Sequence, residues 1–130
     1  MELVKIVSEI LGKEVPAPNA RLLQIVYSRQ QDEGAKDFTF LMSTLKPEGG
    51  QTEYHIHPVD EMILILSGKG EGIMGEDRCT LEPGTVLYAP TGIRHQCINS
   101  SVEPMQMACF YVPALPDESV QGIVEASTEK

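Results

Sequence analysis

The spacing of hydrophobic and polar positions changes at a proline-containing segment, PAPN, at residues 16–19. Before it, apolar residues recur at helical spacing (Leu3, Ile6, Val7, Ile10 and Leu11), which predicts a short amphipathic helix or, alternatively, an irregular strand covering the outside of the domain. After it, short β-like runs alternate with turn sequences as far as residue 112. Many short strands separated by Gly and Pro turns predict an all-β sandwich or barrel, with its core at about 20–113.

The predicted strands and turns follow each other closely. The strand-like runs are RLLQIVYSR, FTFLMSTLK, TEYHIH, EMILILSG, GEGIMG, RCTLE, TVLYAP, RHQCIN and MQMACFYV. EPGT at 82–85 fits a type II turn, since Gly84 stands where a positive φ is needed. APTG at 89–92 fits a type I turn, with Pro90 fixing φ.

One predicted strand is apolar on both faces. MILIL at 62–66 does not alternate, so we expect it to be covered on both sides. In a small barrel the second cover must be another layer or another subunit, which predicts a homodimer.

The last segment reads differently from the barrel core. PALPDESVQGIVEASTEK contains two prolines and mixed charges, so we expect residues 114–130 to form a loosely held tail. No internal repeat or second domain is visible, and residues 1–130 are interpreted as a single domain.

Charge and composition exclude some classes of partner. The chain has 10 basic and 19 acidic residues, a net charge of −9, which argues against nucleic-acid and anionic-membrane surfaces. No apolar run approaches the roughly 20 residues that cross a bilayer, and the N-terminus lacks the apolar core of a secretory signal. The 3 cysteines are odd in number and without CxxC spacing, so we expect reduced thiols and a cytoplasmic location.

The three histidines and one carboxylate form a candidate metal site. His55 and His57 are two residues apart, so on a strand both imidazoles project from one face, from Cα atoms roughly 7 Å apart. Pro58 ends that strand, Glu61 begins the next and can reach back, and His95 follows the APTG turn. This mixed N/O ligand set suits a divalent transition metal (Mn, Fe, Ni, Zn, Co or Cu) and not Ca or Mg.

The spacing around these residues is more specific than the ligand types. The first motif consists of Gly49, His55, His57, Glu61 and Gly68, and the second of Gly84, Pro90, Gly92, His95 and Asn99. The sequence resembles the cupin superfamily at all of these positions, with the short spacing between motifs that is seen in small bacterial members. The resemblance implies an antiparallel jelly-roll β-barrel of six to eight strands, with a metal inside it and two coordination positions left open. It also implies that the glycines shape turns and that Asn99 anchors a turn or strand end.

The residues around the metal are predicted from strand alternation. By parity with the histidines, Glu53 faces inward, where it can act as a general base, although it can equally lie at the solvent mouth. Cys97 shares a face with His95. The strand at 105–111 turns inward either Met105, Met107, Cys109 and Tyr111 or Gln106, Ala108 and Phe110. The pocket candidates are therefore Phe40, Met42, Cys97, Met107 and Cys109, with ordinary core packing as the preferred alternative for the Met and Phe side chains.

Cupins with this ligand set carry out several reactions, and the fold alone does not select one. Our first hypothesis is a dioxygenase-like oxidoreductase in which the metal acts as Lewis acid on a small organic acid or enol. The alternatives are a non-oxidative cupin enzyme (decarboxylase, lyase or isomerase) and a metal-dependent ligand-binding module without turnover. A sugar isomerase needs a polar pocket, which the expected Met and Phe walls disfavour.

Overall fold

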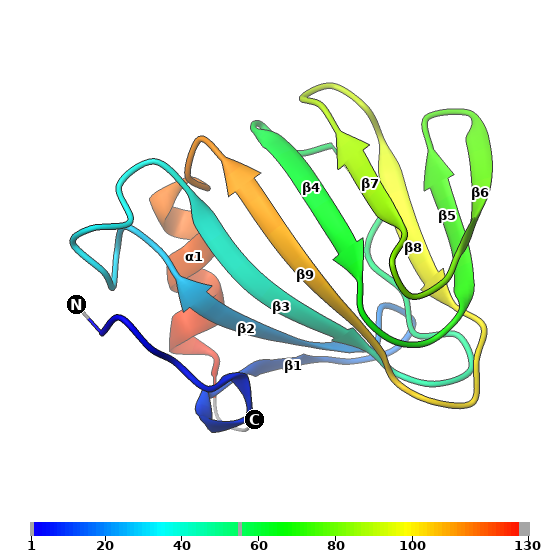
Figure 1. The fold of residues 1–130 in the computed structure, drawn as a ribbon, viewed down its shortest axis with the longest axis horizontal. Helices are drawn as coiled ribbons and strands as arrows, with labels where there is room; N and C mark the ends of the chain where they lie inside the picture. The colour runs from blue at the N-terminus through cyan, green and yellow to red at the C-terminus, as the bar shows by residue number, and fades with distance from the viewer. Residues whose placement is uncertain (1, 55, 128–130) are drawn as a thin grey trace.

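The computed structural model describes residues 2–54 and 56–127 of the chain. Within them the strands form two antiparallel sheets (Figure 1). The six-stranded sheet has the order β1-β2-β3-β9-β4-β7, and the three-stranded sheet has the order β6-β5-β8. The elements are η1 (Val7–Glu9), β1 (Lys13–Val15), β2 (Arg21–Tyr27), β3 (Thr39–Leu45), β4 (Asp60–Ile65), β5 (Gly70–Met74), β6 (Asp77–Leu81), β7 (Val86–Ala89), β8 (His95–Asn99), β9 (Met105–Val112) and α1 (Asp117–Glu125).

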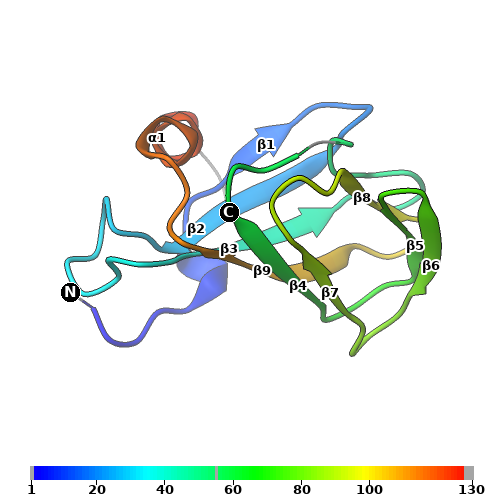
Figure 2. The same cartoon turned by 90° about the horizontal axis from the view of Figure 1, so that it is seen from above.

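The main hydrophobic core is formed mostly by inward-facing residues of the two sheets. Leu45, Ile65 and Met107 come from the large sheet and Leu81 and Cys97 from the small one, and each is at most 1% exposed. Seen from above, β5, β6 and β8 lie at one end of the molecule and α1 at the other (Figure 2). The predicted all-β fold class is confirmed.

The first residues cover half of the outer face of the large sheet. A single 3₁₀ turn, η1, is followed by β1, which pairs with β2, so the segment contains both a helical turn and a strand. Gln24 is buried beneath it, and its side-chain amide donates to the carbonyls of Val7 and Ile10, both at 2.9 Å.

The part of that outer face formed by β4 and β7 is open in the single chain. Ile63 and Ile65 point into the core, whereas Met62 and Leu66 are each 44% exposed. The expected cover of MILIL on both sides is therefore wrong for one copy of the chain, because the N-terminal segment covers only the β2 side. A second copy as the missing cover remains a prediction.

The expected loose tail is wrong as well. Residues 117–125 form helix α1, and Val120 is fully buried in the main core. The Leu115 amide donates to the Thr39 hydroxyl at 2.9 Å, and Arg29 pairs with Asp117 at 3.0 Å. The prolines that suggested disorder lie before the helix, where a ring with fixed φ does not disturb intrahelical hydrogen bonds.

The predicted strand TEYHIH does not form at its described residues, 52–54 and 56–57, which lie in a loop. Gln51 makes an isolated bridge to Ile98, and the Thr52 amide donates to the Cys97 carbonyl at 2.9 Å, after which the described residues leave the sheet. Alternation along a strand therefore does not place Glu53 or His57. No helix in the described ranges is long and apolar enough to cross a membrane.

Candidate metal centre

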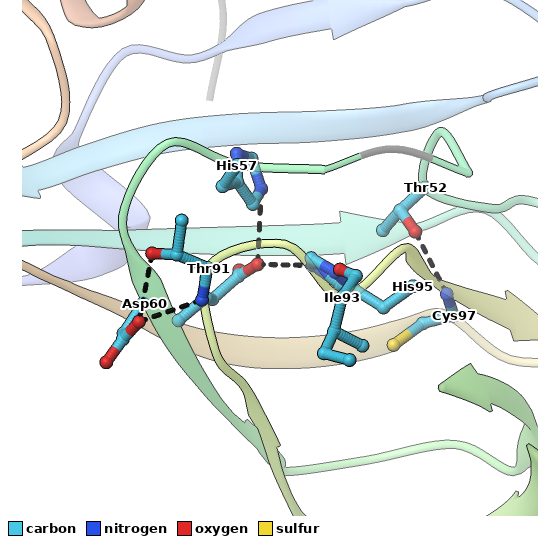
Figure 3. A network of polar contacts seen from close by, with 8 residues as sticks. Thr52, His57, Asp60, Thr91, Ile93, His95 and Cys97 are labelled. Carbon is cyan, nitrogen blue, oxygen red and sulfur yellow. Dashed lines mark hydrogen bonds and ion pairs between the residues drawn. The ribbon is translucent and has the colours of Figure 1, made fainter. Parts of the chain in front are cut away.

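Three of the predicted ligands converge from three segments of the chain. Oε1 of Glu61, on β4, lies 3.2 Å from Nε2 of His57 and 2.8 Å from Nε2 of His95. The potential ligand atoms of these residues all lie within 4.8 Å of one another. Figure 3 shows His57 and His95 approaching the same point from different directions. His55, the fourth predicted ligand, lies outside the described residues.

The turn before β8 sets the orientation of His95. The Ile93 amide donates to the Pro90 carbonyl at 3.1 Å, and Gly92 has φ 94°, which defines a type II turn at 90–93 and corrects the predicted type I turn at 89–92. The Ile93 carbonyl then lies 3.0 Å from Nδ1 of His95 (Figure 3). When Nδ1 donates its proton to this carbonyl, Nε2 is the ring atom that faces Glu61, where it can bind a cation or carry a second proton.

A second contact ties this turn to the strand that carries Glu61. The Asp60 carboxylate accepts hydrogen bonds from the amide and hydroxyl of Thr91, at 2.8 and 3.0 Å (Figure 3). It also accepts one from the Tyr88 hydroxyl at 2.8 Å. These bonds lower the pKa of Asp60, the Thr91 amide contributing most. The spacing between Glu61 and His95 is thus held by backbone, turn and side-chain contacts together.

Glu61 is a buried carboxylate that stays ionised. It is 3% exposed. Burial acts to raise its pKa, but hydrogen bonds with His57, His95 and Tyr111 outweigh burial and lower the pKa to about 2. Burial raises the pKa of Tyr111 well above its ordinary value, so its phenol keeps its proton and donates a hydrogen bond to Glu61.

These residues fit a divalent transition metal. If both imidazoles are neutral and their Nε2 atoms are unprotonated, the lone pairs on Nε2 face the lone pairs of one carboxylate oxygen. This arrangement is unfavourable unless a proton or a cation lies between the three groups. A cation shared by His57, Glu61 and His95 relieves all of these contacts at once. Two imidazoles and a carboxylate are common ligands of zinc and neighbouring metals, and the Ile93 carbonyl supplies the outer hydrogen bond that such histidines usually make.

A cavity of about 200 Å³ opens beside this cluster. At about 30 Å³ per water, it has the volume of roughly six or seven waters, which suits a small organic molecule. Its lining is Arg21, Leu23, Leu41, Ser43, Thr52, Glu53, His57, Glu61, Ile63, His95, Met107, Cys109, Tyr111, Leu115, Ser119 and Ile123. Helix α1 contributes the last two of these, so the segment expected to be a tail forms part of the wall.

The predicted wall residues are divided by the structure. Met107 and Cys109 line the cavity, and Glu53 lies on its lining but is exposed, at the mouth. Cys97 is 1% exposed and belongs to the core, outside the lining. Burial raises the pKa of the Cys97 thiol to about 12.

The placement of Phe40 and Met42 in the cavity wall is wrong. Both lie on the outer face of β3, where Phe40 stacks on Phe110 at a centroid distance of 4.5 Å. Register explains the difference, because Leu41 pairs with Cys109 and Ser43 with Met107, and these pairs face inward. The sequence offered two apolar faces in FLMSTL, and alternation alone did not say which one was internal.

Sequence reasoning missed Arg21 and Ser43 on this wall. Arg21, Leu23 and Ile25 share the inward face of β2, so the signal was an arginine in phase with internal apolar residues. Since both faces of RLLQIVY are largely apolar, that phase could not be recognised before the sheet was known.

Comparison with known proteins identifies the family. The sequence profile of the Cupin domain family matches residues 41–111, and the chain belongs to this family. A predicted oxalate decarboxylase from Thermotoga maritima superposes with a TM-score of 0.76 at 18% identity, covering 85% of this chain and 99% of the other. An RmlC-like cupin from Shewanella frigidimarina NCIMB 400 gives a TM-score of 0.74 at 10% identity, covering 92% and 96%. At these identities the likeness shows the fold, and it confirms the predicted cupin architecture.

Curated relatives with similar sequences are longer proteins. The glucose-6-phosphate isomerase of Pyrococcus abyssi is 31% identical in an alignment 116 residues long, which covers 79% of this chain and 59% of the relative. That of Thermococcus litoralis is 32% identical over 99 residues, covering 66% and 52%. The chain thus spans little more than half the length of these relatives.

Proposed function

We propose that this cupin is a metal-dependent enzyme that acts on a small organic acid or enol, with the metal as Lewis acid. The observation that carries the proposal is the convergence of His57, Glu61 and His95 at a cavity sized for a small molecule. A divalent metal supplies polarisation of a bound oxygen and stabilises the negative charge that develops there.

The chain's own residues have separate roles in this proposal. His57, Glu61 and His95 hold the ion, and Tyr111 orients Glu61 through its hydroxyl. Apolar wall residues such as Leu41, Ile63 and Met107 exclude water and so strengthen electrostatic interactions inside the cavity. Glu53, at the mouth, is positioned to take a proton from the substrate and return it to another atom.

We favour a non-oxidative reaction over the oxygenase that sequence analysis placed first. The similar proteins compared above include isomerases and a predicted decarboxylase, which supports proton transfer or decarboxylation without dioxygen. Arg21 and Ser43 also make the cavity more polar than the expected Met and Phe walls. Isomerisation of a hydroxy-carbonyl compound is therefore the second candidate, and the oxygenase stays a prediction to be tested beside it.

One experiment separates these possibilities. Protein loaded in turn with Mn, Fe, Co, Ni, Cu or Zn is incubated in D₂O with small hydroxy acids, keto acids and sugar phosphates, and followed by NMR and an oxygen electrode. Deuterium incorporation or CO₂ release without oxygen uptake supports the proposal, and Glu53→Gln should lower kcat with metal content unchanged. Oxygen consumption would establish the oxygenase. If no metal supports turnover of any of these compounds, a ligand-binding module is favoured instead.

The homodimer remains part of the proposal. Its support is the open outer face of β4 and β7, where Val86 and Tyr88 are 63% and 56% exposed beside Met62. Sedimentation of the wild-type chain against Val86→Glu tests it, since a charge at this position would dissociate a dimer formed through that face and leave a monomer unchanged.

A further inference from the structure

Arg21 brings a buried positive charge to the cavity wall. The residue is 9% exposed, and in the described part of the chain its guanidinium makes one hydrogen bond, from Nη1 to the Asn19 carbonyl at 2.9 Å. Burial lowers its pKa, and the negative charge of Glu53 acts against that effect. A guanidinium has five N–H donors, and burying them is unfavourable unless an acceptor or a counter-ion is near.

Ser43 presents a second polar group to the same cavity. The residue is 2% exposed, and its Oγ has no hydrogen-bond partner among the residues that the structure describes. Leu23 pairs with Ser43 and Arg21 pairs with Leu45 across β2 and β3, so Arg21 and Ser43 are diagonal neighbours on the inward face. The Ser43 hydroxyl and the Arg21 guanidinium are both buried hydrogen-bond donors, and together they lack an acceptor.

This polar pair is separate from the metal cluster. Glu61 pairs with Tyr111 on β9, whereas Ser43 pairs with Met107 on the same strand. Met107 and Tyr111 are four residues apart on β9, so the backbones of Ser43 and Glu61 are about 13 Å apart along the strand direction. The side chains of the two sites extend into the cavity and shorten the distance between their polar atoms. A ligand that touches both therefore carries a polar group at each end.

We propose that Arg21 and Ser43 form a subsite for the carboxylate of a small organic acid whose other polar end lies at the metal centre. The assignment of an organic acid rests on the proposed function, whereas the anion subsite itself rests on these two side chains. A carboxylate accepts two parallel N–H bonds from Arg21 and one O–H bond from Ser43, which satisfies both buried groups. Thr52 and Ser119 are the other aliphatic hydroxyl side chains of the lining.

The test compares dicarboxylates with acetate by calorimetry on zinc-loaded protein. Malonate, succinate, glutarate and adipate can reach both centres, whereas acetate reaches one. We expect the best dicarboxylate to bind at least about tenfold more tightly than acetate, and Arg21→Met to remove this preference with zinc content unchanged. Ser43→Ala should reduce it severalfold. In metal-free protein the Arg21-dependent part of the binding should persist, so the subsite can be judged even if no turnover is found.

Matched variants separate binding from packing. Among the described residues, Ser28 carries the other buried hydroxyl without a partner, and it does not line the cavity. Ser28→Ala deletes this hydroxyl and Arg29→Met removes an exposed arginine, and neither should change the preference. Equal affinity for acetate and every dicarboxylate in the wild type, or a preference that survives Arg21→Met, would overturn the proposal. Tighter Arg21-dependent binding of phosphonoacetate than of malonate would contradict the carboxylate assignment in favour of a phosphoryl group. If Arg21→Met fails to fold, Arg21→Lys serves, with an expected partial loss because lysine lacks the planar pair of donors.

Discussion

Oε1 of Glu61 lies 2.8 Å from Nε2 of His95, and this contact joins the two sheets of the fold. Glu61 belongs to β4 in the six-stranded sheet, and His95 begins β8 in the three-stranded sheet. We expect an ion held between these side chains to cross-link the sheets and so to couple metal binding to folding stability.

Metal should raise the thermal stability of the wild-type chain and leave Glu61→Gln nearly unaffected. A ligand that binds only the folded state stabilises it by about 2.7 kcal/mol at 100 times its Kd. Glu61→Gln removes the carboxylate charge with little change in shape. Thermal unfolding with and without added zinc measures both. Glu71→Gln, an exposed carboxylate paired with Arg78, is the control and should respond as the wild type does. An equal metal-induced rise in Glu61→Gln would contradict the assignment of this ligand.

Asn99→Ala should destabilise the fold by about 2–4 kcal/mol, because several buried hydrogen bonds are lost at once. The Asn99 side-chain amide donates to the carbonyls of Leu45, Lys46 and Glu103, and its oxygen accepts from the amide and hydroxyl of Ser101. Urea unfolding gives the free energy of unfolding.

Ser101→Ala is the comparison for Asn99→Ala. It removes one hydroxyl from the same network and keeps the amide contacts, so its cost should be clearly smaller. Equal costs for the two variants would mean that Asn99 does not anchor the strand end.

Cysteine labelling should distinguish Cys79 from the two buried cysteines, Cys97 and Cys109. Burial raises the pKa of Cys97 to about 12 and that of Cys109 well above its ordinary value, so both stay protonated at pH 8, where a thiolate is needed for reaction. Cys79 is only partly buried. We expect a thiol reagent to modify one cysteine in the native protein at pH 8 and all of them after unfolding, counted by mass spectrometry. Rapid native labelling of Cys97 or Cys109 would disagree with this packing.

Phe40→Ala and Leu41→Ala should differ in what they change, because adjacent residues on β3 face opposite sides. Phe40→Ala removes the stacked pair with Phe110 and should cost about 1–3 kcal/mol of stability without altering dicarboxylate affinity. Leu41→Ala enlarges the cavity and should alter that affinity as well as stability. Unfolding and calorimetry on the two variants measure both quantities. A change in affinity with Phe40→Ala alone would place the wrong face inward.

The sequence predicted the cluster of His57, Glu61 and His95 better than the walls around it. His57, Glu61 and His95 could be grouped because motif spacing carries information that does not depend on which face of a strand is internal. Phe40 and Met42 were misplaced because FLMSTL is apolar on both faces, and one face is covered by an N-terminal segment that packs only in the folded chain. Arg21 was missed for the same reason.

The C-terminal helix could not be predicted from local pattern either. Val120 is buried against the barrel, and Ser119 and Ile123 reach the cavity, but these contacts are tertiary. The prolines before Asp117 suggested the end of regular structure, and they do lie in the connection between β9 and the helix. The helix after this connection depends on packing against the barrel, and the residue spacing within the segment does not reveal that packing.

Elemental analysis of the gently purified wild-type chain beside His57→Ala tests the central claim most directly. We predict roughly one transition-metal ion per wild-type chain. The variant should lose most of this metal while it keeps the same circular dichroism spectrum. A wild-type chain that carries no metal and takes none up on dialysis against Mn, Fe, Co, Ni, Cu or Zn would contradict the metal centre described above.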